Sequence, residues 1–260
     1  MPRIFRTKSQ SGIYHVITRG NDRNLIFLDS KDYSMYLAIL KKYQEECKFD
    51  IFAYCLMTNH IHLLIRENPE CHSISQIMHR INLAFVKYYN KRYHRVGHLF
   101  QGRFTSVEVE DEDYFRTALR YIHQNPLRAN ATAYIDQYKW SSYNEYVLKP
   151  YFCNVDFTLN LFPDQGAKNK EAFYAYHRTF PDNAKMPKEL PEANTKIKDP
   201  EAILLINALA GVTDPKIVSD FNSDRRHTIV FTLKEKYHLS NRQIARLTGI
   251  NRKNVTSVKS

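Results

Sequence analysis

The sequence lacks several features that would place it in a familiar class. Its four cysteines form no C-x-x-C pair, which argues against both a disulfide framework and a cysteine zinc site. It has no run of about 18 apolar residues, and residues 1–12 are polar and basic without the apolar segment of a secretory signal. We therefore expect a cytoplasmic protein with no membrane partner.

Negative charge is also scarce. The 260 residues include 27 Asp and Glu against 38 Lys and Arg, which gives a formal net charge of +11. Because each cation placed on a phosphate releases a counterion, this imbalance favours a polyanionic partner, and nucleic acid is the first candidate. A chain of this length is expected to hold one full core and a smaller second unit.

The first half of the chain alternates strand-like and helix-like patterns. The runs rich in β-branched and aromatic residues, which predict strands, are 13–19, the two halves of 49–65 and 105–109. Helical spacing of apolar residues follows Asp29 or Ser30, covers 73–89 and resumes near Glu112, in a helix that Pro126 is predicted to close. This order predicts an α+β fold, a ferredoxin-like or RRM-like antiparallel sheet palm covered by helices.

The pattern loosens after residue 150. One more helix is predicted at 168–180, and residues 181–200 hold four prolines among charged residues, a composition typical of a linker. Apolar periodicity resumes at Ala202. We predict an α+β domain at 1–150, a helix and Pro/Lys-rich linker at 151–200, and a small all-α domain at 201–260.

Residues 239–258 resemble a helix-turn-helix. Ser240 can cap a first helix and Gly249 permits a turn, while Ile250, Val255 and Val258 would bury one side of a second helix. The side chains that would then face DNA include Asn251, Arg252, Lys253 and Asn254. A helical hairpin that does not bind DNA is the alternative.

Two histidines share one face of a predicted strand. Side chains alternate in His60-Ile61-His62, so both imidazoles point the same way, about 7 Å apart along the chain. This spacing suits two ligands of one cation. Two ordinary histidines on a half-exposed strand would give the same pattern.

Tyr121 and Asn125 share one face of the helix that starts near Glu112. At about 100° per residue, Tyr121 falls outside the apolar stripe that contains Phe115 and Ile122. Asn125 lies one turn further on, where its amide oxygen could reach the cation held by the histidines. A tyrosine that packs its ring and hydrogen-bonds its hydroxyl is the alternative.

Four blocks of the sequence, in order, resemble the HUH-endonuclease single-tyrosine transposases. They are most similar to REP-associated tyrosine transposases and their insertion-sequence relatives, and they lie at 54–65, 96–106, 120–129 and 140–143. The resemblance implies that His60 and His62 bind Mg²⁺ or Mn²⁺, with Asn125 as a third ligand where many relatives have Gln. It also implies that Tyr121 is the nucleophile and forms a 5′-phosphotyrosine without a nucleotide cofactor.

Arginines near these blocks, interleaved with aromatic residues, are typical of a groove for single-stranded DNA. The predicted contacts are Arg19, Arg23, Arg92, Arg95, Arg103, Arg120 and Arg128; solvated surface charges are the alternative.

The resulting prediction is a transposase that cuts and rejoins single-stranded hairpin or repeat DNA, with a homodimer among the assemblies that the resemblance allows. A catalytically silent, sequence-specific DNA-binding regulator and a relaxase-like replication initiator remain as alternatives. A zinc hydrolase is less well supported, because no cluster of acidic ligands accompanies the histidines.

Overall fold

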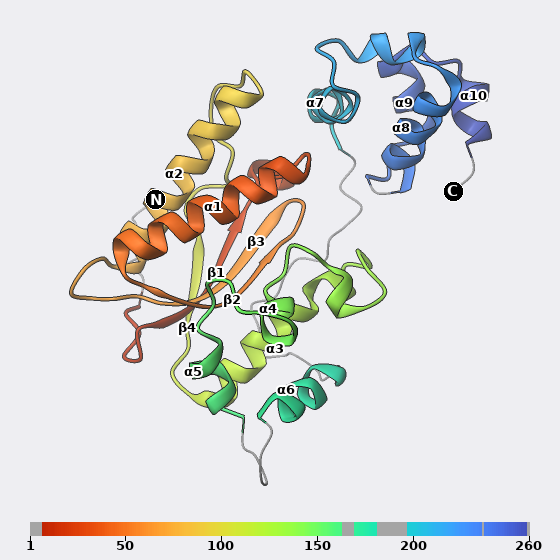
Figure 1. Cartoon of the computed structure of the whole chain (residues 1–260). Helices are drawn as coiled ribbons and strands as arrows, with labels where there is room; N and C mark the ends of the chain where they lie inside the picture. The colour runs from red at the N-terminus through yellow and green to blue at the C-terminus, as the bar shows by residue number, and fades with distance from the viewer. Residues whose placement is uncertain (1–6, 163–168, 181–196, 236, 259–260) are drawn as a thin grey trace.

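Four short strands form one antiparallel sheet in the N-terminal half. The computed structural model describes residues 7–162, 169–180, 197–235 and 237–258. Its strands are β1 (Ile13–Arg19), β2 (Asp50–Leu56), β3 (His60–Arg66) and β4 (Thr105–Glu108). They are arranged in the order β2-β3-β1-β4 (Figure 1). The predicted α+β fold is confirmed.

The turn after β1 depends on a glycine. The N–H of Gly20 donates to the carbonyl oxygen of Asn59 at 2.9 Å, which ties the end of β1 to the turn between β2 and β3. A β-carbon at residue 20 would lie 2.0 Å from the carbonyl oxygen of Asn24, so a larger residue would force the backbone to move. The turn therefore fixes the end of β3 at which His60 lies.

Two helices cover one side of the sheet and a third covers the other (Figure 1). The first two, α1 (Ser30–Cys47) and α2 (Ile74–Arg92), pack on each other, and the third is α3 (Glu112–Arg128). Each begins at a side chain that accepts backbone N–H groups of the first turn, and these caps are Asp29, Ser73 and Asp111. On β3, His60 and His62 contact Asn125 of α3, so the alternating Ile61 and Leu63 face the other side.

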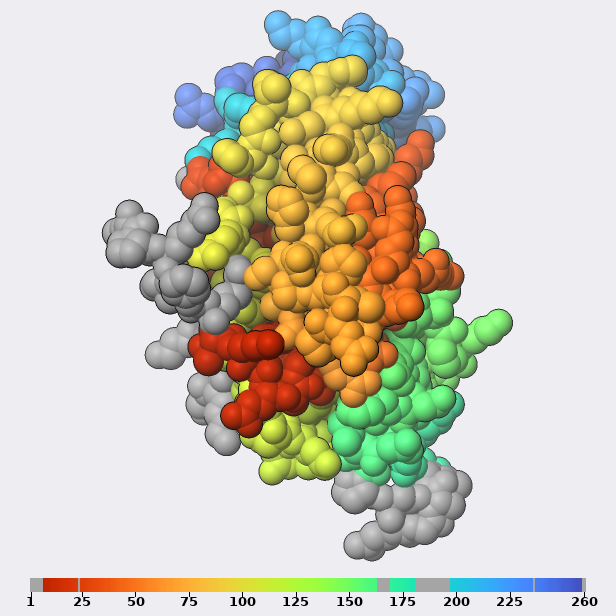
Figure 2. Space-filling model, turned by 90° about the vertical axis from the view of Figure 1, so that its left-hand side faces the viewer, coloured from red at the N-terminus to blue at the C-terminus, as the bar shows by residue number. Residues whose placement is uncertain are grey.

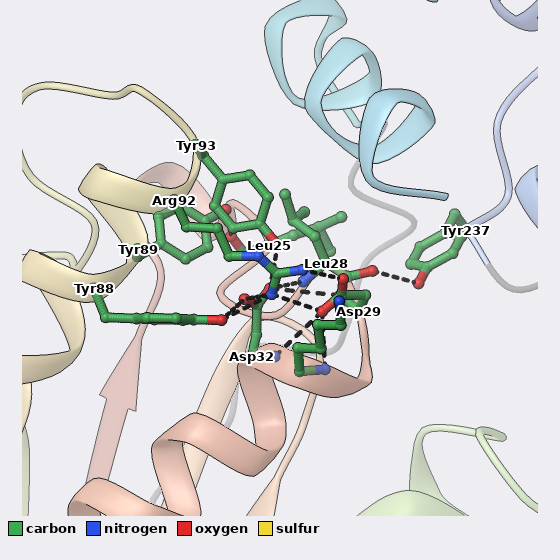
Figure 3. A network of polar contacts seen from close by, with 10 residues as sticks. Leu25, Leu28, Asp29, Asp32, Tyr88, Tyr89, Arg92, Tyr93 and Tyr237 are labelled. Atoms are coloured by element: carbon green, nitrogen blue, oxygen red, sulfur yellow. Dashed lines mark hydrogen bonds and ion pairs between the residues drawn. The ribbon is translucent and has the colours of Figure 1, made fainter. Parts of the chain in front are cut away.

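A buried carboxylate joins α1 to α2. Asp32 is completely buried and accepts hydrogen bonds from the hydroxyls of Tyr88 at 3.1 Å and Tyr93 at 2.8 Å. It also accepts from the guanidinium of Arg92 at 2.6 Å and from the N–H of Leu28 at 2.8 Å (Figure 3). Burying a charge is costly unless it is paired and hydrogen-bonded, and this network meets both conditions.

α3 extends further than the sequence predicts. Pro126 was expected to close the helix, but the helix continues to Arg128. Because proline lacks an N–H group, it removes one hydrogen bond of the last turn, and the N–H of Ala129 still donates to the carbonyl oxygen of Asn125 at 3.0 Å. A proline this near the end shortens the hydrogen-bond ladder without breaking the helix.

Three further helices follow α3: α4 (Tyr143–Val147), α5 (Val155–Asn160) and α6 (Asn169–Arg178). α6 corresponds to the helix expected at 168–180, of which residue 168 lies outside the described part of the chain. Phe173 of α6 is fully buried and stacks on Tyr146 of α4, with ring centroids 4.7 Å apart. This contact packs α6 on α4, and α6 also contacts α3, the helix that carries Tyr121.

All regular elements in the described C-terminal residues, 197–235 and 237–258, are helices. They are α7 (Asp199–Ala210), the 3-10 helix Pro215–Asp220, α8 (Ser223–Glu235), α9 (Asn241–Thr248) and α10 (Arg252–Ser257). Leu205, Leu233 and Ile244 are fully buried in the apolar interior of this C-terminal part. Most of the expected linker, residues 181–196, lies outside the described residues, whereas Pro200 lies in the first turn of α7.

A hydrogen bond links this C-terminal part to Leu28, just before the start of α1. The hydroxyl of Tyr237, which is 7% exposed, donates to the carbonyl oxygen of Leu28 at 3.2 Å (Figure 3). Burial raises the pKa of Tyr237 to about 12, so the hydroxyl keeps its proton for this bond at neutral pH. The C-terminal helices lie beyond the ends of α1 and α2 in the space-filling view (Figure 2).

Candidate active site

The two histidines of β3 lie together on the side of the sheet that α3 covers. Their ring centroids are 4.9 Å apart; His62 is completely buried and His60 is 5% exposed. The ring of His60 is oriented by its neighbour, because Asn59 Oδ1 lies 2.7 Å from His60 Nδ1 and a carbonyl oxygen can only accept. His60 Nδ1 therefore carries the proton, and Nε2 presents a lone pair.

Asn125 of α3 contacts both histidines through its amide. Asn125 Nδ2 lies 3.2 Å from His62 Nε2, and Asn125 Oδ1 lies 3.3 Å from His60 Nε2. The second contact brings together two atoms that both carry lone pairs. Two ligand atoms bonded at right angles to one ion at about 2.1 Å would be about 3.0 Å apart, so the 3.3 Å separation of Asn125 Oδ1 and His60 Nε2 fits two ligands of one cation, and His62 Nε2 lies beside the same amide group.

Tyr121 lies one turn before Asn125 on α3, next to the same histidines. Its ring centroid is 5.9 Å from that of His62, and its side chain is only 6% exposed. The tyrosine is thus more buried than a single apolar stripe would predict, because α3 is covered on both sides. The guanidinium carbon of Arg128 lies 5.6 Å from the centre of the same ring, so a cation lies beside the phenol.

α6 holds the part of α3 that carries Tyr121. Gln124 donates to the carbonyl oxygens of His177 at 2.9 Å and Thr179 at 2.8 Å. The rings of His123 and His177 are joined at 3.0 Å, and burial lowers the pKa of both, that of His177 to about 3. Both rings are therefore neutral at neutral pH. No spacing in the sequence predicts this contact, because its partners are 54 residues apart.

Two of the arginines expected to bind DNA have partners within the protein instead. Arg92 forms ion pairs with Asp29 and Asp32. Arg120 is 6% exposed, lies over the ring of Tyr176 at 3.9 Å and donates to the hydroxyl of Thr179 at 2.9 Å. Both guanidinium groups therefore have partners within the protein, and their contact with DNA stays a prediction.

The other five arginines differ in their surroundings. Arg103 and Arg128 are exposed, whereas Arg19 and Arg95 are half-buried. The guanidinium of Arg95 lies 5.6 Å from the ring centre of Tyr89. The side chain of Arg23 lies outside the described part of the structure.

In the C-terminal part, the predicted contact residues separate into two kinds. Arg252, Lys253 and Asn254 are exposed on α10, and the first two line a shallow depression of about 470 Å³ with Thr256 and Ser257. The side chain of Asn251 instead caps α10 by accepting from the N–H of Lys253 at 2.9 Å. This cap was not foreseen, although Asn before a helix is a common capping signal.

Two absences concern the described residues alone. No group of three or more His, Cys, Asp or Glu within them is arranged to hold a metal ion; the set around His60 differs in using an amide. None of the helices seen in 7–162, 169–180, 197–235 and 237–258 is both long and apolar enough to cross a membrane.

Comparison with known proteins identifies the N-terminal domain. Residues 8–125 match the family model described as "Transposase IS200 like", and they include the four strands, the histidine pair and α3 as far as Asn125. The resemblance seen in the sequence is thereby confirmed: these residues form a transposase domain of the IS200-like family, a family of DNA-processing enzymes. No curated protein matches the chain.

Two solved structures are similar to this chain. A REP-associated tyrosine transposase bound to a REP hairpin is 18% identical, with a TM-score of 0.50 over 56% of this chain and 86% of the other. A putative transposase from Deinococcus radiodurans R1 is 17% identical, with a TM-score of 0.34 over 44% of this chain and 92% of the other. At this level of identity, the first likeness supports the fold alone.

Proposed function

We propose that this chain is a metal-dependent single-stranded DNA endonuclease and strand transferase that uses Tyr121 as its nucleophile and acts on hairpin or repeat DNA. One observation carries the proposal: Tyr121 and Asn125, one turn apart on α3, both lie beside the histidine pair of β3. The phenol of Tyr121 therefore lies beside two imidazoles and an amide, which are groups that can bind a cation, and not only among apolar side chains.

His60, His62 and Asn125 are proposed to hold Mg²⁺ or Mn²⁺. The amide oxygen of Asn125 lies 3.3 Å from Nε2 of His60, a separation that fits two ligands of one ion, and His62 Nε2 lies beside the same amide. An amide oxygen is a ligand that hard cations such as Mg²⁺ and Mn²⁺ accept. When bound, a divalent cation would neutralise the charge of the scissile phosphate and stabilise the charge that develops during attack.

The reaction proposed for Tyr121 conserves the phosphodiester bond energy. The phenol oxygen attacks the phosphorus and loses its proton, the bond from phosphorus to the 3′ oxygen breaks, and that oxygen takes up a proton. The products are a 5′-phosphotyrosine at residue 121 and a free 3′-hydroxyl. Attack by a 3′-hydroxyl on the phosphotyrosine reverses these steps and joins DNA, so no nucleotide cofactor is needed. Arg128 is proposed to contact a phosphate of the bound strand, because it is exposed and its guanidinium lies beside the ring of Tyr121.

The proposal predicts a covalent protein–DNA adduct. Full-length protein is incubated with labelled libraries of single-stranded hairpins and Mg²⁺ or Mn²⁺, and the products are separated on denaturing gels. We expect an adduct that requires the metal and disappears when EDTA is added first. A protein that shifts the same hairpins on native gels but forms no adduct at any metal concentration would instead be a DNA-binding regulator.

The α9–α10 pair is proposed to act as a helix-turn-helix that binds duplex DNA, with the exposed cations of α10 on its phosphates. Each phosphate contact contributes about 0.9 to the slope of log K against log salt. The double substitution Arg252→Ala, Lys253→Ala should therefore reduce that slope by about one to two on a mixed-sequence duplex, measured by fluorescence anisotropy. Lys216→Ala, which removes an exposed cation outside α10, is the matched control. An unchanged slope in the double variant would assign duplex binding to another surface.

A further inference from the structure

A third histidine lies next to the proposed metal ligands and has no role in the scheme above. His15 is in the middle of β1 and is completely buried. In the register of the two strands, His15 pairs with Leu64 and Ile17 pairs with His62. Directly paired residues share a face of the sheet, so His15 points to the same side as His62 and α3.

The ring nitrogens of His15 and His62 are in direct contact. His15 Nε2 lies 3.0 Å from His62 Nδ1. On its other side, His62 Nε2 accepts from the amide of Asn125 at 3.2 Å. When Nε2 of His62 binds a cation, the proton of this imidazole is on Nδ1, and Nε2 of His15 is the atom within reach to accept it.

His15 also lies against the nucleophile. The ring centroids of His15 and Tyr121 are 6.0 Å apart at an interplanar angle of 67°. One buried side chain of β1 thus touches a residue of β3 and faces the phenol of α3. A change in the orientation of the His15 ring would be transmitted to both.

From this geometry we infer that His15 is a positioning residue that holds His62 with Nε2 turned toward the metal site. The inference rests on the proposed function. Histidines that bind metals commonly donate their second ring N–H to a partner, which fixes the ring and its tautomer, and loss of that partner typically weakens metal affinity about 10- to 100-fold. Here the partner is the imidazole of His15.

The test measures Mn²⁺ binding to the DNA-free, full-length protein by electron paramagnetic resonance titration. His15→Phe keeps a ring of similar size but cannot accept the proton of His62, and it should weaken Mn²⁺ binding about 10- to 100-fold. Adduct formation should recover in part at high Mn²⁺. His15→Gln, whose amide oxygen can accept, should retain most of the affinity. His79→Phe, which removes an exposed histidine of α2, should match the wild type.

Equal Mn²⁺ affinity in His15→Phe and the wild type would overturn the inference while leaving the proposed function intact. A wild-type protein that neither binds Mn²⁺ nor forms an adduct would remove the proposed function as well. If His15→Phe does not fold, long-range ¹H–¹⁵N spectra of the metal-free wild type decide the question. The proton of His62 is expected on Nδ1, and a proton on Nε2 would refute the role of His15.

Discussion

Replacing Tyr121 with phenylalanine is expected to abolish adduct formation while DNA binding and folding remain close to those of the wild type. The substitution removes one oxygen atom and keeps the ring, which is 6% exposed and lies 5.9 Å from that of His62. Loss of a nucleophile that no other group replaces costs about 10⁴-fold or more in rate. The measurement is the initial rate of adduct formation on a hairpin selected with the wild-type protein.

Tyr114→Phe provides the matched control, because Tyr114 is a half-buried tyrosine two turns earlier on the same helix. It should form the adduct at a rate near that of the wild type. Retention of substantial adduct formation in Tyr121→Phe would show that another residue attacks the phosphate, and the role proposed for α3 would then be wrong. Native-gel binding of both variants separates loss of chemistry from loss of DNA affinity.

The second large effect is expected on stability, at Asp32. Asp32→Ala leaves the guanidinium of Arg92 without its buried partner, and the hydroxyls of Tyr88 and Tyr93 lose their acceptor. Breaking a buried pair by removing one member typically costs about 3–5 kcal/mol. We expect the free energy of unfolding, measured by urea denaturation, to fall by that amount. The m value, which is the dependence of this free energy on urea concentration, should stay unchanged.

The fluorescence of Trp140 offers a local probe for this experiment. It is the one tryptophan of the chain, and its ring stacks on that of Tyr33, the residue after Asp32, with centroids 4.6 Å apart. Asp113→Ala is the control, since it removes an ion pair with Arg116 in which the aspartate is 91% exposed, and exposed pairs contribute about 0–1 kcal/mol. A loss below about 1 kcal/mol in Asp32→Ala would show that the network in Figure 3 contributes little to stability.

Features that depend on neighbours in the sequence could be predicted well. The strands at 13–19 and 49–65 follow from β-branched and aromatic runs, and Asp29 and Ser240 act as the caps that their positions suggest. The shared face of His60 and His62 follows from strand alternation alone. Local periodicity and capping chemistry are sufficient for these features, because each is decided within a few residues.

Features that depend on distant partners could not be predicted in this way. The protein partners of Arg92 and Arg120 could not be predicted, because they lie about 60 residues away in the chain and charge alone does not distinguish a phosphate from an aspartate or a carbonyl. His15 was missed because a single histidine in a strand has no spacing signal. Only the pairing of β1 with β3 brings it to His62. The end of α3 was predicted too early, at Pro126. A proline in the last turn removes one hydrogen bond but does not end the helix, which continues to Arg128.

The most direct measurement is the chemical identity of the covalent link between protein and DNA. The adduct formed by the wild-type protein is digested with protease and nuclease, and the crosslinked peptide is sequenced by tandem mass spectrometry. We predict a nucleotide joined through its 5′-phosphate to the phenol oxygen of Tyr121, together with a DNA product that ends in a free 3′-hydroxyl. A phosphate on any other residue, or a link to the 3′ end, would contradict the convergence of β3 and α3 on one reacting phosphate.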